Sequence, residues 1–474
     1  MILNEHYKKI HLIGISGTGM TALTNLLVQS GFMVSGSDIA FYPPMGEFLK
    51  SLPIKLYEGY NSKNLTDAQP DVIIVGNAIS RGNPELEYAL EKRMVMLSLP
   101  QAMHHIYLYK SRNIVVTGTH GKTTTTSLVS HILQAPGYNA SYFCGGIPLN
   151  FGTPSKLGDP ELFVLEGDEY DSAYFDKSPK FMKYNPYILI LNNIEFDHAD
   201  IYPSLDDIIR QFYYVTRLVP SNGTIVANGD DANVQQVLKG AHAPIITYGQ
   251  QSDNDVRFKI TQKGNKFFLQ IITEKNNEYF IEMNFPMTGL AYNMTASFIA
   301  ARAMGCSIEQ IIAGLASFRG VKRRLEQVAV TDKFIIFDDF AHHPTAVKTT
   351  LHALKKKYAN DRLIAIFEPR SNTSIRNIFS SDYAEALQIA DVVFLAPPFQ
   401  KKSQQIESPL DLQTIQGKLQ KHGTICKIGE DYHDLLGKVR DSLPDSGIVV
   451  LMSNGSFEPF KSRFIDYMLH RMIS

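Results

Sequence analysis

The sequence has few cysteines, no long apolar run and almost no net charge, and each absence excludes a class of protein. Its three cysteines are scattered, odd in number and without the paired spacing of a metal site, which predicts reduced thiols in the core of a cytoplasmic protein. No apolar run approaches the length that spans a membrane. The first residues lead directly into a predicted strand, without the apolar core and cleavage site of a signal peptide.

The formal net charge of −1 produces no long-range field that would attract nucleic acid or an anionic membrane. We therefore predict neither as a partner, and we expect anionic ligands to be bound by local sites. At 474 residues the chain has the length of about three domains. Its 44% hydrophobic and 20% charged residues are typical of a globular protein.

The pattern at residues 112–133 predicts a phosphate-binding loop. Residues 112–117 are an apolar strand, Gly118-Thr119-His120-Gly121-Lys122-Thr123 is a glycine loop, and a helix is predicted from Thr124 to Leu133. Backbone N–H groups and the helix dipole at such a junction bind phosphate, and we assign this role to the loop and Thr124. Lys122 would contact the outer phosphates and Thr123 would hold Mg²⁺. Val116 replaces the first glycine of the full motif, so an ordinary turn is the alternative interpretation.

A second glycine loop lies near the start of the chain. A strand at 9–15 precedes a helix at 20–30, and a second strand at 33–37 ends at Asp38. The loop has the pattern G-x-x-G-x-G, which departs from the strict dinucleotide fingerprint and indicates a nucleotide diphosphate more than a nicotinamide. A tight turn without ligand is the alternative, and Asp38 could contact a ribose or cap a helix. The predicted binding residues are Gly14, Ser16, Gly17, Thr18, Gly19, Asp38 and, after the strand at 71–75, Asn77 and Ser80.

Acidic residues follow the next apolar strands. The strand at 162–165 leads into Glu166-Gly167-Asp168-Glu169-Tyr170-Asp171, and the strand at 188–193 leads into a segment that contains His198. Carboxylates at a strand end beside a phosphate loop are suitable Mg²⁺ ligands. The alternatives are a solvated acidic loop and a histidine that only stabilises its own loop.

The rest of the chain alternates strands and helices. Residues 256–286 predict antiparallel hairpins, and residues 288–305 predict a helix that carries Asn293, a poor helix former that suggests a contact with a nucleobase. After 320, strands at 334–338, 363–367, 392–396 and 448–452 each end in a polar loop. Arg323-Arg324, before the first of them, could bind phosphate across a domain gap or form a solvated surface pair.

Six motifs in this order, GTHGKTTT, EGDEYD, NNIEFDHAD, VKRRLE, DDFAHHPT and EPRSNT, resemble those of the Mur ligase family of ATP-dependent amide-bond-forming enzymes. The resemblance extends over essentially the whole chain. It implies an α/β fold of three domains: a Rossmann-like UDP-sugar-binding domain at 1–110, a P-loop ATPase-like central domain at 111–320 with a parallel sheet plus a small antiparallel sheet, and a Rossmann-like domain at 321–474 for the amine or peptide substrate.

Within the family, the chain is similar to the branch that acts on UDP-N-acetylmuramate directly. Residues 168–186, DEYDSAYFDKSPKFMKYNP, together with EPRSNT and MSNG, look like members that attach the murein tripeptide L-alanyl-γ-D-glutamyl-meso-diaminopimelate during cell-wall recycling. Members that add L-alanine instead typically carry DES, a tyrosine in a DDYAHHP-type motif and a QPHRYTRT-like run. The L-alanine-adding activity is the alternative within the family, and a monomer or weak dimer is expected.

The resemblance also implies roles for individual residues, with ATP and Mg²⁺ as cofactors. Lys122 and Thr123 would hold ATP phosphates, and Thr123, Glu166 and His198 would hold Mg²⁺. Asn293, Arg324 and Asp338 would contact adenine, phosphate and ribose, while His343 and Arg370 would face the incoming peptide. Two features of relatives are missing: the histidine and first asparagine of an H-N-x-x-N run before Asn293, and a metal-supporting carbamylated lysine, because 204–219 contain no lysine.

Three other classes are compatible with single motifs. A regulatory protein that hydrolyses ATP to drive domain motion would also need the phosphate loop. A UDP-sugar-binding module without activity is disfavoured by the complete set Lys122, Thr123, Glu166 and His198. A dinucleotide dehydrogenase is disfavoured because the strict fingerprint is absent and the GKT loop would have no role.

Overall fold

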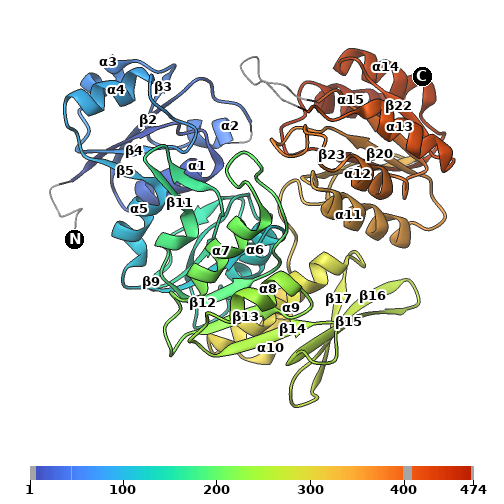
Figure 1. Ribbon diagram of the computed structural model, residues 1–474, viewed down its shortest axis with the longest axis horizontal. Coiled ribbons are helices and arrows are strands. Elements are labelled where there is room, and N and C mark those ends of the chain that lie inside the picture. The colour runs from blue at the N-terminus through green and yellow to red at the C-terminus, as the bar shows by residue number, and fades with distance from the viewer. Residues whose placement is uncertain (1–6, 44, 399–407, 471–474) are drawn as a thin grey trace.

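Three sheets flanked by helices follow one another along the chain in this computed structural model (Figure 1). The structure describes residues 7–43, 45–398 and 408–470. We call the elements from β1 to α5 the N-terminal unit, those from β6 to α10 the central unit and those from β18 to α15 the C-terminal unit. Within these described residues, no helix is both long and apolar enough to cross a membrane.

The N-terminal unit is a five-stranded parallel sheet in the order β3-β2-β1-β4-β5. Its strands are β1 (Lys9–Ile13), β2 (Met33–Asp38), β3 (Lys55–Glu58), β4 (Val72–Val75) and β5 (Met96–Ser98). Its helices are α1 (Thr18–Gln29), α2 (Met45–Lys50), α3 (Ser62–Ala68), α4 (Pro84–Glu91) and α5 (Leu99–Met103). Because all strands run parallel, their carboxyl ends and the loops that follow lie at one edge.

The central unit has a ten-stranded sheet in the order β17-β16-β15-β14-β13-β12-β6-β9-β7-β8. The strands are β6 (Arg112–Thr117), β7 (Ala140–Phe143), β8 (Ser155–Lys156), β9 (Asp159–Glu166), β12 (Pro186–Leu191), β13 (Thr224–Asn228), β14 (Ile245–Gly249), β15 (Val256–Lys263), β16 (Lys266–Ile272) and β17 (Glu278–Met283). The strands from β14 to β7 pair in parallel, whereas β15, β16 and β17 pair antiparallel with one another. The predicted hairpins therefore continue the parallel sheet instead of standing apart from it.

Helices cover both faces of this sheet. They are α6 (Lys122–Ile132), α7 (Leu205–Thr216), α8 (Ala232–Leu238), α9 (Thr288–Ala303) and α10 (Ile308–Ala316). Two short elements, β10 (Asp171–Ala173) and β11 (Asp176–Pro179), form a separate antiparallel pair. Helix α6 begins at Lys122, two residues earlier than predicted, so that the lysine lies in the first helical turn directly after the glycine loop.

The C-terminal unit is a six-stranded sheet in the order β18-β19-β23-β20-β21-β22, parallel except for the edge strand β18. The strands are β18 (Glu326–Val330), β19 (Phe334–Asp339), β20 (Leu363–Phe367), β21 (Val392–Leu395), β22 (Ile425–Ile428) and β23 (Gly447–Met452). The helices are α11 (Pro344–Lys357), α12 (Ser380–Leu387), α13 (Leu412–Lys421), α14 (Tyr432–Ser442) and α15 (Phe460–His470). The polar loops predicted after β19, β20 and β23 again share one edge.

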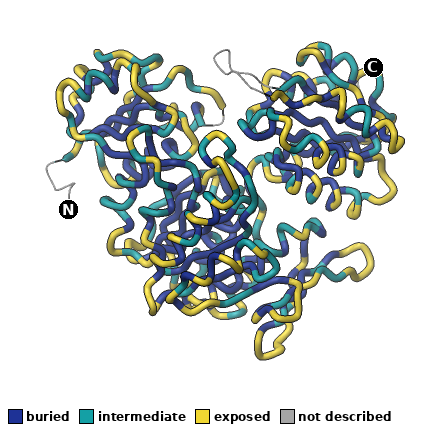
Figure 2. Tube along the Cα trace, viewed as in Figure 1, coloured by how far each residue is buried: buried dark blue, intermediate teal, exposed yellow. Residues whose placement is uncertain are grey.

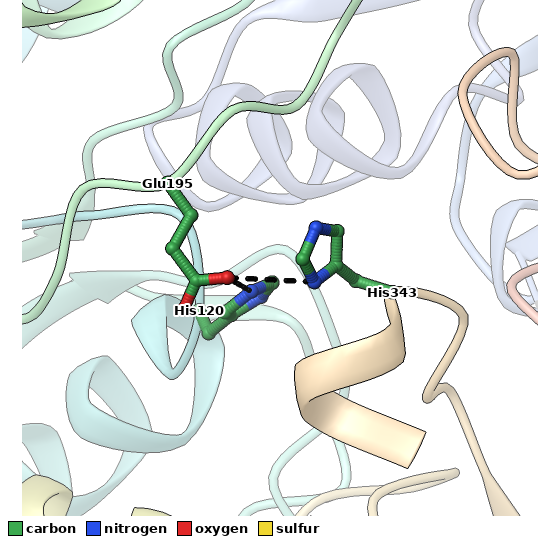
Figure 3. A group of neighbouring side chains, drawn as sticks. All are labelled: His120, Glu195 and His343. Atoms are coloured by element: carbon green, nitrogen blue, oxygen red, sulfur yellow. Dashed lines mark ion pairs between the residues drawn. The ribbon is translucent and has the colours of Figure 1, made fainter. Parts of the chain in front are cut away.

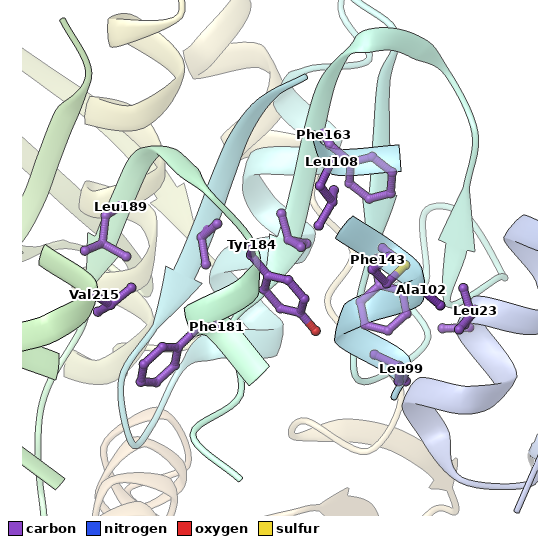
Figure 4. Packing of buried hydrophobic residues seen from close by; sticks show 14 of the residues in the cluster. Leu23, Leu99, Ala102, Leu108, Phe143, Phe163, Phe181, Tyr184, Leu189 and Val215 are labelled. Atoms are coloured by element: carbon purple, nitrogen blue, oxygen red, sulfur yellow. The ribbon is translucent and has the colours of Figure 1, made fainter. Parts of the chain in front are cut away.

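The hydrophobic core is divided unevenly among the three units. The buried strands lie inside each unit and the exposed chain lies outside (Figure 2). One cluster combines N-terminal residues such as Leu23 and Leu99 with central residues such as Phe143 and Leu189 (Figure 4). The C-terminal sheet has its own clusters on its two faces. The N-terminal and central units therefore share a core, whereas the C-terminal unit has clusters of its own, against which Phe285 and Met287 of the central unit pack.

A core substitution tests this packing. Leu189 of β12 is fully buried in the cluster that also contains Val215 of α7. Leu189→Ala should therefore lower the free energy of unfolding by about 2–5 kcal/mol through lost burial and a residual cavity. Urea unfolding followed by circular dichroism measures the change. Leu218→Ala removes the same atoms from a residue that is 40% exposed, and it should change the free energy by less than about 0.5 kcal/mol. Equal effects of the two substitutions would contradict the packing described.

Candidate functional site

One cleft with a volume of about 1470 Å³ is lined by all three units. Most residues predicted to bind substrate or cofactor lie on its wall: Gly14, Gly17, Thr18, Gly19, Asp38, Asn77, Thr119, His120, Gly121, Lys122, Thr123, Thr124, Glu166, His198, Asn293, Arg324 and His343. Five predicted residues do not line it: Ser16, Ser80, Gly118, Asp338 and Arg370. The cleft is formed by loops at the carboxyl ends of parallel strands, by the segment 284–293 and by the segment 318–325.

The loop between β6 and α6 has the backbone that a phosphate cradle requires. Gly118 (φ +128°) and Gly121 (φ +82°) adopt conformations that favour glycine, and a Cβ on Gly118 would lie 2.9 Å from the carbonyl oxygen of Asn193. Lys122 Nζ donates to the Gly118 carbonyl at 2.7 Å and the Thr119 carbonyl at 3.2 Å. The lysine therefore closes the loop on itself.

Two asparagines at the end of β12 fix this loop. Asn193 Oδ1 accepts a hydrogen bond from the His120 amide at 2.7 Å, and the Asn193 carbonyl accepts from the Thr119 amide at 3.0 Å. Asn192 Nδ2 donates to the His120 carbonyl at 3.2 Å. Neither asparagine was predicted as a site residue. The available signal was a pair of amides directly after an apolar strand, at the edge where ligands bind.

Thr123 and Glu166 form the centre of the predicted metal site. Thr123 Oγ1 donates to Glu166 Oε1 at 3.0 Å, and the Gly145 amide donates to Glu166 Oε2 at 2.7 Å. Burial raises the pKa of Glu166, and the charge of Lys122 opposes that rise. The hydroxyl of Thr123 and the carboxylate of Glu166 fit Mg²⁺, which prefers hard oxygen ligands and keeps several waters, whereas the imidazole of His198 contacts Glu169.

His198 is connected to this site through Glu169, a residue that the sequence analysis did not single out. His198 Nε2 lies 2.8 Å from Glu169 Oε1, and Lys122 Nζ lies 2.7 Å from Glu169 Oε2. Burial alone would lower the pKa of His198, but the hydrogen bond and charge of Glu169 raise it above its ordinary value. Glu169 therefore links His198, the predicted metal ligand, to Lys122, the predicted phosphate ligand.

The N-terminal glycine loop is held by Asp38. The Ser16 amide donates to Asp38 Oδ2 at 2.8 Å, and the Tyr60 hydroxyl donates to Oδ1 at 3.1 Å. Asp38 therefore stabilises the loop and caps no helix. The Ser16 hydroxyl donates to the Ala40 carbonyl at 3.2 Å, away from the cleft, and Ser80 is exposed outside it. The backbone of the loop therefore faces the cleft, whereas the side chains of Ser16 and Ser80 do not.

The two aspartates at the end of β19 have opposite orientations. Asp338 was predicted to contact ribose, but it is paired with Arg323 (Nε to Oδ2, 3.3 Å) and with Lys461, and it does not line the cleft. Asp339 lines the cleft instead, and burial raises its pKa to about 6. Consecutive side chains point to opposite faces of a strand, so only one of the two neighbouring aspartates can face the cleft. In this structure Asp339 replaces Asp338 on the wall of the cleft.

The two arginines before β18 also separate. Arg323 donates to the Ser453 carbonyl at 2.7 Å and stabilises the C-terminal unit internally. Arg324 lies over the ring of Phe340, at 4.6 Å from its centroid, and its Nη2 reaches Thr123 Oγ1 at 3.5 Å. Burial lowers the pKa of Arg324. Arg324 is thus a cation of the C-terminal unit that lies at the phosphate loop of the central unit.

A cluster of His120, Glu195 and His343 joins the central and C-terminal units (Figure 3). Glu195 Oε2 lies 3.5 Å from His120 Nε2 and 3.6 Å from His343 Nδ1, and it accepts a hydrogen bond from Thr345 Oγ1 at 2.8 Å. Burial lowers the pKa of His343 to about 4, and His120 reinforces the shift. His343 also caps α11 by accepting from the Thr345 amide. The predicted peptide-facing histidine is therefore neutral near pH 7 and belongs to an interface.

Arg370 and Asn293 complete the set of predicted residues. Arg370 Nη1 lies 3.5 Å from Glu368 Oε1, and its side chain packs so closely on Gly455 that a Cβ there would lie 2.1 Å from Arg370 Cδ. Arg370 therefore lies behind the cleft wall, whereas Asn372 of the same loop lines the cleft. Asn293 lies in α9, and its Oδ1 would be 2.4 Å from a Cβ on Gly121. It therefore lies directly beside the phosphate loop.

Comparison with known proteins gives consistent matches along the chain. The family descriptions "Mur ligase family, catalytic domain", "Mur ligase middle domain" and "Mur ligase, glutamate ligase domain" match residues 9–110, 116–301 and 323–455. The UDP-N-acetylmuramate–L-alanyl-γ-D-glutamyl-meso-2,6-diaminoheptandioate ligase of Haemophilus influenzae is 38% identical over 404 residues, which are 83% of this chain and 86% of that protein.

Two solved structures are similar to the chain over nearly its full length. A murein peptide ligase from Psychrobacter arcticus has a TM-score of 0.74 and 33% identity, and the match covers 96% of this chain and 98% of that one. A UDP-N-acetylmuramate–alanine ligase from Thermotoga maritima has a TM-score of 0.81 at 22% identity, with 98% and 99% covered. At that identity the second likeness shows the fold alone.

The cluster of His120, Glu195 and His343 predicts a pH effect on stability. Between pH 6.5 and about 4, His343 becomes protonated in the unfolded chain but stays neutral in the folded chain, so acid favours unfolding. On lowering the pH from 7.5 to 5.5, the wild type should lose about 1 kcal/mol of unfolding free energy more than His343→Asn, whose amide can still cap α11. Urea titrations at both values measure this. If the difference in unfolding free energy between the two proteins were the same at both pH values, a neutral His343 would be contradicted.

Proposed function

Because the chain belongs to the Mur ligase family, we propose that it is an ATP-dependent ligase that joins the tripeptide L-alanyl-γ-D-glutamyl-meso-diaminopimelate to UDP-N-acetylmuramate. The main observation in support is the single cleft, which runs from the N-terminal glycine loop past the phosphate loop to loops of the C-terminal unit. A ligase of this kind has to bring three substrates together, and each unit contributes one wall. The name of the Haemophilus relative, at 38% identity, supports this choice of substrates.

In this proposal the central domain, residues 111–320, binds ATP and Mg²⁺. The loop of Gly118, Thr119, His120 and Gly121, with Lys122, Thr123 and Thr124, would hold the phosphates, while Asn293 beside the loop would face the adenine. Thr123, Glu166 and His198 would hold Mg²⁺, which when bound offsets charge on the transferred phosphoryl group. Arg324 would stabilise the same charge from the C-terminal unit. Asp339 replaces Asp338 as the candidate for the ribose, because it lines the cleft.

The N-terminal domain, residues 1–110, would bind the UDP group. Backbone amides of the loop Gly14–Gly19 are suited to a pyrophosphate because Gly14 (φ +81°) lets the chain turn tightly beside Ile79. Asp38 would keep that loop in place. Asn77, on the cleft wall after β4, would contact the nucleotide, whereas a role for Ser16 and Ser80 would require their side chains to turn toward the cleft.

The reaction proceeds through an acyl phosphate. The muramate carboxylate attacks the γ-phosphorus of ATP, the bond to the bridging oxygen breaks, and ADP leaves. The free amine of the tripeptide then attacks the acyl carbon, and the tetrahedral intermediate expels inorganic phosphate as the amine loses its proton. Lys122 would stabilise charge on the phosphates throughout. Docking of the C-terminal unit over the cleft would exclude water from the acyl phosphate.

The C-terminal domain, residues 321–474, would bind the peptide. Arg370 can bind a carboxylate bidentately after its side chain leaves Gly455, and His343, neutral near pH 7, would face the peptide amine. The same proposal places the protein in the cytoplasm as a monomer or weak dimer that serves cell-wall recycling. Addition of L-alanine to UDP-N-acetylmuramate is the second candidate, since it uses the same nucleotide and sugar sites.

The lysine of the phosphate loop provides the first test. Lys122→Ala should lower the rate of ATP-dependent ligation by about 100-fold or more, because it removes the cation at the transferring phosphoryl group. Phosphate release measures the rate, and circular dichroism shows whether the fold is intact. Lys348→Ala removes a lysine whose pairing with Glu385 is exposed, so its rate should stay within about twofold of wild type. Ligation by Lys122→Ala near the wild-type rate would refute the phosphate site.

The choice of amine provides the second test. With ATP, Mg²⁺ and UDP-N-acetylmuramate, phosphate release should be strong with the tripeptide and weak with L-alanine. Mass spectrometry of the product identifies the new amide bond. Turnover with L-alanine alone would instead assign the biosynthetic reaction, and release without any amine would favour a regulatory ATPase.

A further inference from the structure

The loop that follows β20 lies against the segment that carries His198. Thr373 Oγ1 donates to Asp197 Oδ1 at 2.8 Å, and Asn372 Nδ2 donates to Asp200 Oδ2 at 2.9 Å. Thr373 is 3% exposed and Asp197 is 6% exposed, so the contact between them is buried. These hydrogen bonds join the candidate peptide-binding loop of the C-terminal unit to the candidate metal-binding segment of the central unit.

Asp197 controls the backbone of His198. The oxygen that accepts from Thr373, Oδ1, also accepts from the His198 amide at 2.7 Å. His198 has φ +55°, a left-handed conformation that is unfavourable for a residue other than glycine. Such a conformation persists only where its surroundings enforce it. The Asp197 carboxylate contributes to this, together with the Ile201 and Tyr202 amides that donate to the His198 carbonyl. Thr373 in turn holds that carboxylate.

The imidazole of His198 continues the connection to the phosphate lysine. Its Nε2 lies 2.8 Å from Glu169 Oε1, and Glu169 Oε2 lies 2.7 Å from Lys122 Nζ. The Tyr170 ring packs on the other side of the imidazole, with its centroid 4.1 Å away. A continuous series of contacts therefore runs from Thr373 through Asp197, His198 and Glu169 to Lys122.

We propose that Thr373 is a positioning residue whose hydroxyl completes the divalent-metal site only when the C-terminal unit is docked. With the unit apart, Asp197 would lose one donor and His198 would be free to relax out of its left-handed conformation. The metal site and the phosphate lysine would then lose a fixed neighbour. This arrangement delays formation of the acyl phosphate until the peptide-binding unit covers the cleft, so that an amine and not water reaches it. The inference rests on the proposed metal site and, for this last consequence, also on the proposed ligase reaction.

Thr373→Val tests this, because it removes the hydroxyl of Thr373 and keeps the shape of the side chain. Mn²⁺ binding to the full-length protein with a non-hydrolysable ATP analogue and UDP-N-acetylmuramate is measured by electron paramagnetic resonance. Thr373→Val should weaken Mn²⁺ binding about 5- to 10-fold, whereas Thr373→Ser, which keeps the donor, should stay within about twofold of wild type. In ligation assays Thr373→Val should lower kcat by about tenfold or more and leave the KM for the tripeptide within about threefold.

Thr345→Val is the matched control. It removes another hydroxyl that crosses the same interface, to Glu195 at 2.8 Å, but this hydroxyl makes no hydrogen bond to Asp197 or His198. Its Mn²⁺ affinity should equal that of wild type, so a general loss of docking is distinguishable from a loss at His198. If valine does not fit the buried position, the measurement is repeated with Thr373→Ala.

Unchanged Mn²⁺ affinity in Thr373→Val, or equal weakening in the serine and valine variants, would overturn the proposal. Equal weakening in Thr345→Val would overturn it as well, since the effect would then come from docking in general. The Mn²⁺ measurement needs no turnover. A wild type that binds Mn²⁺ as described but ligates no amine would therefore refute the proposed function and leave the positioning role of Thr373 intact.

Discussion

The structure around the cleft depends on the charge of one lysine that is buried beneath the phosphate loop. The Lys122 side chain is 12% exposed and that of its partner Glu169 is 3% exposed. A buried charge without a partner is costly, so the loop, the acidic segment and His198 have to remain together. The Tyr202 hydroxyl, which donates to the Glu169 carbonyl at 2.6 Å, anchors the segment to the loop that precedes α7. In the proposed function, an incoming phosphate would replace the carboxylate as the partner of the lysine, so the ammonium group would not be left unpaired.

Much of this architecture could be predicted from the sequence because its signals are local. An apolar strand followed by glycines and a helix determines the course of the backbone over a few residues, and the predicted strand at 112–117 coincides with β6. The α/β fold with parallel sheets was confirmed, as was the resemblance to the Mur ligase family. The ends of helices were less predictable. Local propensity favours a helix that starts at Thr124, but α6 begins at Lys122, directly after Gly121.

Other parts of the site depend on contacts between distant segments. Asp338 and Asp339 are chemically identical neighbours, and only the register of β19 against its partner strands determines which of them reaches the cleft. Glu169 was one acid among several in a short run, and its importance follows from a histidine that is far away in sequence. The meeting of His120 with His343 likewise requires the docking of two units, which no local pattern in the sequence encodes.

The uneven division of the core has a consequence for how such enzymes diversify. Because the N-terminal and central units share buried side chains such as Leu23 and Phe143, a change in one of them requires compensating changes in the other, and the two must evolve together. The C-terminal unit keeps its own core, against which Phe285 and Met287 of the central unit pack, and it meets the loops of the cleft through hydrogen bonds such as those of Thr345 and Thr373. Selection can therefore remodel the loops of this unit, and with them the accepted amine, while the machinery that activates the carboxylate is inherited unchanged.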